Sequence, residues 1–187
     1  MQMECKVEGK KPMGKMLAIL VLAGLFLTGC AGSDTSEAQN QQGTQSVNRA
    51  EYQKIVDDAK QGDVDKMEQV KIKVTVNGKE FHGTLENNAT TRAMLEKGIF
   101  PMTIPMTNAY GREMLYRYGA GTFPVEKTRS DNFKVGDIIY WPPRGSFVIL
   151  YHQDGDTFER QQVGHIDGDF SVFENGKNAT VTFELVK

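Results

Sequence analysis

The chain has 187 residues and a formal net charge of −2, because 24 aspartates and glutamates slightly outnumber 22 lysines and arginines. This mildly acidic balance argues against a nucleic-acid partner, since binding to phosphates requires a basic surface. Cys5 and Cys30 are the only cysteines. Beyond Cys30 the chain can therefore form neither a disulfide framework nor a thiolate metal site, and a hydrophobic core must supply its stability.

The first thirty residues have the order of an export signal. A basic segment that ends at Lys15 precedes an uncharged apolar run from Met16 to Leu27. A helix that spans a bilayer permanently takes about twenty apolar residues, so this shorter run is typical of the apolar region of a signal peptide. Met13 would serve equally well as the first residue, which leaves the true start open between Met1 and Met13.

The end of the signal, Leu27-Thr28-Gly29-Cys30, resembles the lipobox of bacterial lipoproteins. The resemblance implies cleavage before Cys30 and attachment of fatty acyl chains such as palmitate to that cysteine. We therefore expect residues 1–29 to be a lipoprotein signal peptide. Cys30 would then anchor the rest of the chain in the cell envelope, on the extracytoplasmic side of a bacterial membrane. The alternative is an ordinary secretory signal with a cysteine there by chance.

Three further segments are expected after the signal. Residues 30–47 are small and polar, and they predict a flexible tether behind the acylated cysteine. Asn48 and Glu51 have the spacing of a capping box, which predicts a short helix at the start of a helix-and-linker segment, residues 48–66. Residues 67–187 form the main domain, which is long enough to bury a core of its own.

In Val70–Val76 the apolar residues recur with a period of two, which predicts a strand. The Asn77-Gly78 pair predicts a tight hairpin turn, and Lys79–Leu85 returns as the partner strand. Asn88 is then expected to cap a short helix at Ala89–Lys97. Further strands are predicted at Met102–Thr107, Glu113–Tyr118, Asp137–Trp141, Phe147–His152, Thr157–Val163 and Thr180–Val186.

This set of elements predicts a mainly β domain, a closed eight-stranded barrel with one or two short helices. Closure is favoured because it leaves no exposed strand edges. Apolar members of the alternating runs are expected to share the interior of the barrel. These are Ile72, Val74, Phe81, Leu85, Ile139 and Ile149.

The ordered motifs resemble the small bacterial cyclophilin-like domains. The residues that carry the resemblance are VKIKVTVNGKEFHGTLENNATTRAMLEKGIFPMTIPM in the first half and VGDIIYW, FVILYH, VGHID and NATVTFE in the second. The resemblance extends from Val70 to Glu184 and implies a closed barrel of cyclophilin type with a helix over one end, and with VGHID at a turn. It implies no activity for this domain.

Cyclophilins proper catalyse rotation about the peptide bond before proline, with an arginine on the strand that follows the first helix. The corresponding segment here, Phe100–Thr107, contains no arginine, and the glycine-rich segment that follows in cyclophilins is also missing. The resemblance therefore assigns no catalytic residue. Arg112 or Arg160 could replace the missing arginine only in a rebuilt groove, and both are expected to be solvated surface residues.

A candidate ligand groove is assigned on residue type, because arginine and aromatic side chains are typical of binding hot spots. Its members are Arg112, Glu113, Tyr116, Trp141, Tyr151 and Arg160. The alternatives are that Tyr116 packs against Tyr118 on one face of a strand, and that Trp141 plugs the rim of the barrel. The three histidines lie far apart without the spacing of metal ligands, so we expect neither a metal nor another cofactor.

Three functions are open at this stage. The leading hypothesis is a membrane-anchored domain, without enzymatic activity, that presents a groove to a peptide or small ligand. The second is a peptidyl-prolyl isomerase whose catalytic arginine has moved, and the third is an accessory protein that only contacts other envelope proteins. A groove with Arg112 or Arg160 over an apolar floor would favour the isomerase, whereas a smooth barrel flank would favour the accessory protein.

Overall fold

The computed structural model describes residues 45–62, 70–130, 133–153, 155 and 157–187. The predicted signal peptide, Cys30 and most of the predicted tether lie outside these residues. The helices are α1 (Arg49–Lys60) and α3 (Ala89–Glu96), with a short 3-10 helix at Phe170–Phe173. The strands are β1 (Lys71–Val76), β2 (Lys79–Leu85), β3 (Met102–Ala109), β4 (Glu113–Arg117), β5 (Asp137–Trp141), β6 (Ser146–Leu150), β7 (Gln161–Asp167) and β8 (Ala179–Val186).

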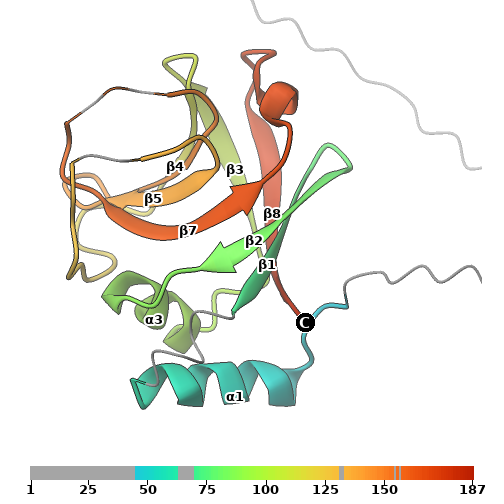
Figure 1. The fold of residues 1–187 in the computed structure, drawn as a ribbon, viewed down its shortest axis with the longest axis vertical. Helices are drawn as coiled ribbons and strands as arrows, with labels where there is room; N and C mark the ends of the chain where they lie inside the picture. Colours follow the sequence, from blue (N-terminus) through green and yellow to red (C-terminus); the bar gives the residue numbers. More distant parts are fainter. Residues whose placement is uncertain (1–44, 63–69, 131–132, 154, 156) are drawn as a thin grey trace, which may run out of the picture. The chain divides into compact units, whose positions relative to one another are not determined.

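The strands form a closed antiparallel barrel in the order β1-β2-β7-β5-β6-β4-β3-β8 (Figure 1). Every strand is hydrogen-bonded to a neighbour on each side, so closure protects the backbone groups that an open sheet would expose at its edges. The predicted fold, a mainly β domain with a closed eight-stranded barrel and one or two short helices, is confirmed, and the described residues contain two α-helices. Within the described ranges, no helix is long and apolar enough to cross a membrane.

Two local sequence signals form as predicted. Asn77 and Gly78 have φ angles of +50° and +79°, as the tight turn between β1 and β2 requires, and glycine adopts such angles without steric cost. At the start of α1, the side chain of Asn48 accepts from the backbone N–H of Glu51. The carboxylate of Glu51 in turn accepts from the N–H of Asn48, at 2.8 Å. Both the hairpin and the capping box are therefore confirmed.

The seventh strand lies four residues further along the chain than predicted. We expected Thr157–Val163 with a turn at Gly-His-Ile-Asp, but the strand is Gln161–Asp167 and includes that motif. Its glycine permits close approach to β2, because a Cβ at Gly164 would lie 2.5 Å from a β2 carbonyl oxygen. Likewise, a Cβ at Gly83 would lie 1.9 Å from a β7 carbonyl oxygen. These glycines mark closely packed strands rather than a turn.

The interior of the barrel holds five of the six side chains predicted for it, namely Ile72, Val74, Phe81, Leu85 and Ile149. The sixth, Ile139, is fully buried but lies on the outer face, because its neighbours Ile138 and Tyr140 fill the interior. Ile138 and Ile139 are equally apolar, so the residue type did not indicate which of them faces inward. The prediction for Ile139 was wrong in this respect.

A second, smaller apolar cluster therefore covers part of the outer face of the barrel. Its members are Leu115, Phe133, Ile139, Val148 and Leu150. The segment that carries Phe133 lies over β5, and Arg129 in this segment pairs with Arg160 through two backbone hydrogen bonds of 2.9 Å. The covering segments leave the remainder of this face open, and the open part is the groove described below.

The residues that precede α1 are joined to the last strand of the barrel. Ser46 pairs with Val186 in an isolated bridge, and the backbone N–H of Lys187 donates to the carbonyl of Gln45 at 3.2 Å. The α1 helix is held against α3, since the hydroxyl of Tyr52 donates to a carbonyl oxygen of α3 at 2.9 Å. The polypeptide consequently enters the barrel next to the place where it leaves.

Candidate binding groove on the outer face of the barrel

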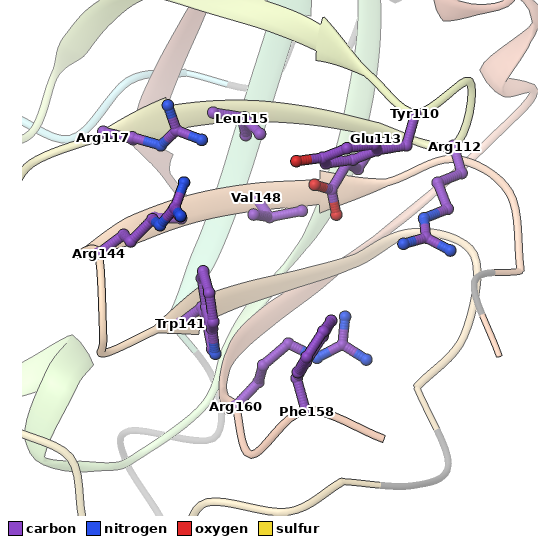
Figure 2. Close-up of a pocket in the computed structure, with 11 residues that line it drawn as sticks. Tyr110, Arg112, Glu113, Leu115, Arg117, Trp141, Arg144, Val148, Phe158 and Arg160 are labelled. Atoms are coloured by element: carbon purple, nitrogen blue, oxygen red, sulfur yellow. The ribbon is translucent and has the colours of Figure 1, made fainter. Parts of the chain in front are cut away.

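A groove of about 330 Å³ lies on the outer face across β4, β6 and β5 (Figure 2). Its floor consists of Leu115 and Val148, which are directly opposite each other on β4 and β6. One row further along, Arg117 on β4 is opposite Ser146 on β6, and Ser146 is opposite Trp141 on β5. Three adjacent strands thus place apolar, basic and aromatic side chains in register on one surface.

Four of the six residues predicted for a ligand groove line this site. They are Arg112, Glu113, Trp141 and Arg160 (Figure 2). Arg112 comes from the β3–β4 turn and Glu113 from the first position of β4, whereas Trp141 ends β5 and Arg160 precedes β7. The barrel therefore brings these residues together from separate parts of the chain. Trp141 lies on the outer face and does not plug the rim.

The other two predicted members, Tyr116 and Tyr151, point into the barrel. The ring of Tyr116 packs edge to face against Tyr118 with 4.9 Å between centroids, as the alternative for this pair expected. Tyr151 is 3% exposed, and its hydroxyl donates to Asn108 at 2.8 Å. Burial, together with the nearby Tyr116, raises the pKa of Tyr118 to about 12. Tyr116 and Tyr151 pack with the core and do not line the groove, so the prediction that they are groove residues was wrong.

Aromatic side chains form the walls of the groove. Trp141 packs against Phe158, with 5.5 Å between ring centroids, and Phe158 itself is 52% exposed. Tyr110, which borders the same groove, is 75% exposed and has a φ angle of +57°. Positive φ angles are uncommon for residues with a Cβ. Exposed aromatic rings next to an apolar floor are typical of a surface that binds a ligand.

Four arginines surround the floor: Arg112, Arg117, Arg144 and Arg160. Arg160 is only 4% exposed, and its guanidinium stacks over the ring of Phe133 at 4.5 Å. We expected Arg160 to be a solvated surface residue, and this was wrong because the segment that covers the outer cluster also covers its side chain. The guanidinium of Arg112 lies 5.6 Å from the ring of Tyr110. Glu113 is the one acidic side chain in the described lining.

Sequence reasoning missed seven residues of this groove. They are Tyr110, Leu115, Arg117, Arg144, Ser146, Val148 and Phe158. The alternation of β4 could have identified two of them, because Leu115 and Arg117 must share a face with Glu113. Arg144 and Phe158 come from connecting segments that approach the groove only because of the strand order β5-β6-β4.

A second, polar cavity of about 360 Å³ lies near the start of β5, and it is lined by Arg129, Lys134, Asp137, Gln162 and His165. Asp137 is 2% exposed, and one of its carboxylate oxygens lies 2.8 Å from Nδ1 of His165. The same carboxylate accepts from the side chain of Gln162 at 3.1 Å and from the backbone N–H of Lys134 at 2.8 Å. Among the described residues, the lining of this cavity includes no serine, threonine or cysteine that could act as a nucleophile. The bonds of Asp137 join the start of β5 to β7.

The closed antiparallel barrel with an external groove defines the class of this protein. A sequence model of the Cyclophilin-like family matches residues 74–184, which is more than half of the chain, and the chain therefore belongs to this family. Among solved structures, the solution structure of the hypothetical protein AF2241 from Archaeoglobus fulgidus is similar over 63% of this chain and 95% of its own. The identity is 16% and the TM-score is 0.45. No curated protein matches the chain.

The outer face of β3 differs from the pattern implied by catalytic cyclophilins. Its outward positions hold Thr103, Pro105 and Thr107, all exposed, and the strand contains no arginine. The arginines of the groove come from β4, from the turns on either side of the floor, and from the segment before β7. A cyclophilin-like barrel is present here without the arginine position of that enzyme class.

Proposed function

We propose that this chain is a membrane-anchored, extracytoplasmic lipoprotein whose cyclophilin-like barrel binds a peptide that carries negative charge. The observation that supports binding is the groove across β4, β6 and β5, which combines an apolar floor with exposed aromatic walls and four arginines. The whole chain has a net charge of −2. Positive charge is therefore concentrated on one surface of an acidic protein, which favours an anionic ligand.

The energetics of the groove also favour binding. Removing an aromatic side chain from water contributes about 1.5–3 kcal/mol, and the side chains of Tyr110 and Phe158 are both exposed. Tryptophan, tyrosine and arginine are the residues that most often dominate binding energies. A ligand that covers the floor and these two rings would gain apolar contact and charge-assisted hydrogen bonds together.

The binding role can be tested with an array of random hexapeptides and a lipid-free chain, residues 31–187, which includes every described residue. We expect the array to select peptides with acidic groups next to apolar side chains. The variant Phe158→Ser should lose most of this binding, because it removes one wall of the groove. Val125→Ser is the matched control, since Val125 is also an exposed apolar residue but lies outside the groove. Absence of selective binding, or equal loss in both variants, would contradict the proposal.

The anchoring role rests on the lipobox resemblance at Cys30 and on the polar segment that follows it. Two or three acyl chains hold a protein on a membrane stably, whereas a single chain gives only marginal binding. Metabolic labelling with a fatty-acid analogue should therefore mark the natural chain and not Cys30→Ser. Equal labelling of the two chains would show that the anchor is elsewhere.

A specific observation also keeps the prolyl isomerase as a second candidate function. Arg112 and Arg160 both line the groove beside an apolar floor, which is the arrangement expected if the catalytic arginine had moved (Figure 2). A donor aimed at the prolyl nitrogen would be needed to lower the barrier of about 18–20 kcal/mol. Without it, a groove that binds the ground state and the twisted state equally well does not accelerate rotation.

A protease-coupled assay on a short Xaa-Pro peptide distinguishes the two functions. If the groove only binds, residues 31–187 should isomerise the peptide at the uncatalysed rate while a true cyclophilin is active in parallel. Efficient turnover that is lost in Arg112→Ala would establish the enzyme instead. Arg112→Lys retains the charge and is the matched variant, because a lysine cannot reproduce the planar fork of the guanidinium.

A further inference from the structure

We propose that the end of the groove formed by Arg117 and Arg144 binds the C-terminal carboxylate of an extended peptide, with the last side chain of the peptide on the apolar floor. This inference rests on the proposed binding function and specifies its ligand class. It is carried by four features of the described residues: where the two arginines lie, their lack of acidic partners, their distance from the floor, and the polar groups along β4.

The two arginines lie at the same end of the groove because of the strand connections. Arg117 is the last residue of β4 and is opposite Ser146, the first residue of β6. Arg144 belongs to the turn that joins β5 to β6, two residues before Ser146. Figure 2 shows both side chains at this end, away from Arg112 and Arg160.

Neither arginine at this end has an acidic partner in the part of the chain that the structure describes. Among the described residues, no carboxylate lies within 4.0 Å of the guanidinium of Arg117 or Arg144. The guanidinium of Arg144 lies 6.0 Å from the ring of Trp141, which restrains its orientation at the edge of the groove. Two like charges beside an apolar surface repel each other, and a planar carboxylate can accept from both forks and remove that repulsion.

The apolar floor begins one row away from this pair. Residues two apart in a strand are separated by about 7 Å, so Leu115 lies about 7 Å along β4 from Arg117, with Val148 beside it. The carboxylate and the side chain of a terminal residue branch from the same Cα, so the carboxylate can reach the two long arginine side chains while the side chain of that residue lies on the floor. The exposed ring of Phe158 and the ring of Trp141 would then form the wall against which that side chain packs.

The remaining length of the groove fits a peptide better than a simple alkyl chain. From Arg117 to Glu113 the outward positions of β4 cover about 13 Å, the length of about four extended residues. Glu113, which is half-buried, places a carboxylate along this path. An alkyl chain would take water away from this carboxylate without offering it a hydrogen bond, whereas a peptide N–H group can donate to it.

The test uses a hexapeptide array synthesised twice, once with free C-termini and once with C-terminal amides, and probed with residues 31–187. The best-binding sequences are then measured in solution in both forms. We expect amidation to weaken binding roughly tenfold or more, as the loss of a charge-assisted hydrogen bond implies. In the double variant Arg117→Gln with Arg144→Gln, the free-acid and amidated peptides should bind with equal affinity. This affinity should match the affinity of the amidated peptides for the natural chain.

Two controls separate charge from folding. Arg49→Gln removes an exposed arginine from α1 and should leave the preference for free acids unchanged. Phe158→Ser should weaken binding of acids and amides by the same factor, because it removes an apolar contact that both forms make. Decanoate, a simple alkyl carboxylate, should compete poorly with the peptides.

The possible outcomes distinguish this inference from the function on which it rests. Binding of acids and amides with equal affinity would overturn the carboxylate site while leaving peptide binding in place. A preference for acids that persists in the double variant, or efficient competition by decanoate, would also overturn it. If neither peptide form binds the natural chain, the proposed binding function itself is wrong.

Discussion

Variants of the turn residue Tyr110 can separate two free energies: the cost of its left-handed backbone in folding, and the contribution of its ring to ligand binding. It lies in the three-residue turn between β3 and β4, has a φ angle of +57° and is 75% exposed. A left-handed backbone costs a residue with a Cβ about 1–2 kcal/mol, but asparagine adopts it more readily. The ring returns little within the chain, since a contact such as that with Arg112, at 5.6 Å, is worth about 0.5–1 kcal/mol at an exposed site.

We therefore expect Tyr110→Asn to be at least as stable as the natural chain and about 1 kcal/mol more stable than Tyr110→Ala. Both variants lack the ring, and only asparagine relieves the backbone, so their difference isolates the cost of the turn. Urea denaturation followed by tryptophan fluorescence would measure it, and 1 kcal/mol corresponds to a Tm shift of about 2–5 °C in a domain of this size.

Peptide affinity should respond differently from stability in the same two variants. Both should bind the selected hexapeptides more weakly than the natural chain, and to the same extent, because both have lost the exposed ring. Equal stability of the asparagine and alanine variants would refute the cost assigned to the backbone. Unchanged affinity in both would show that the ring does not contact the ligand.

Three further predictions concern the barrel itself. Ile139→Ala should cost about 2–5 kcal/mol of unfolding free energy in a urea titration, whereas the same truncation at the exposed Val135 should change it little. Gly83→Ala should destabilise the barrel severely in thermal unfolding, because the added Cβ would overlap the backbone of β7. In Gly98→Ala the added Cβ meets no atom within 4 Å, so only the positive φ angle of this position should cost stability, about 1–2 kcal/mol. The folded-state pKa of Tyr118 is raised to about 12 from its usual 10.0, so its contribution to stability is complete below pH 10 and is lost as the pH rises through 12. Tyr118→Phe should flatten the pH dependence of unfolding in that window, and an unchanged profile would contradict this assignment.

Local signals in the sequence predicted most of the barrel because each has a direct backbone consequence. The Asn77-Gly78 pair requires positive φ angles, and the side chains of Asn48 and Glu51 bond to the first backbone groups of α1. β7 was misplaced because a glycine can indicate either a turn or a close approach between strands. Only the pairing of β7 with β2 and β5 shows that Gly164 belongs to the second kind.

The candidate groove was predicted only in part, for two different reasons. Glu113 and Tyr116 are three residues apart in one strand, so their side chains face opposite sides of the sheet. This alternation alone shows that only one of them can line the groove. The rest could not be read from the sequence. Which segment covers an outer face depends on the strand order, and the positions of Arg144, Phe158 and Arg160 at one groove follow from the adjacency of β5, β6 and β4.

The hydrogen bond between Lys187 and Gln45 has a practical consequence for engineering the chain. Because the polypeptide enters and leaves the barrel at adjacent points, a short linker between these residues would close the domain into a ring, from which circular permutants could be opened at the surface turns. A tag fused after Lys187 would likewise emerge beside Gln45. If the proposed lipid anchor at Cys30 is moved to the other end of the domain, the groove should then be presented in the same direction.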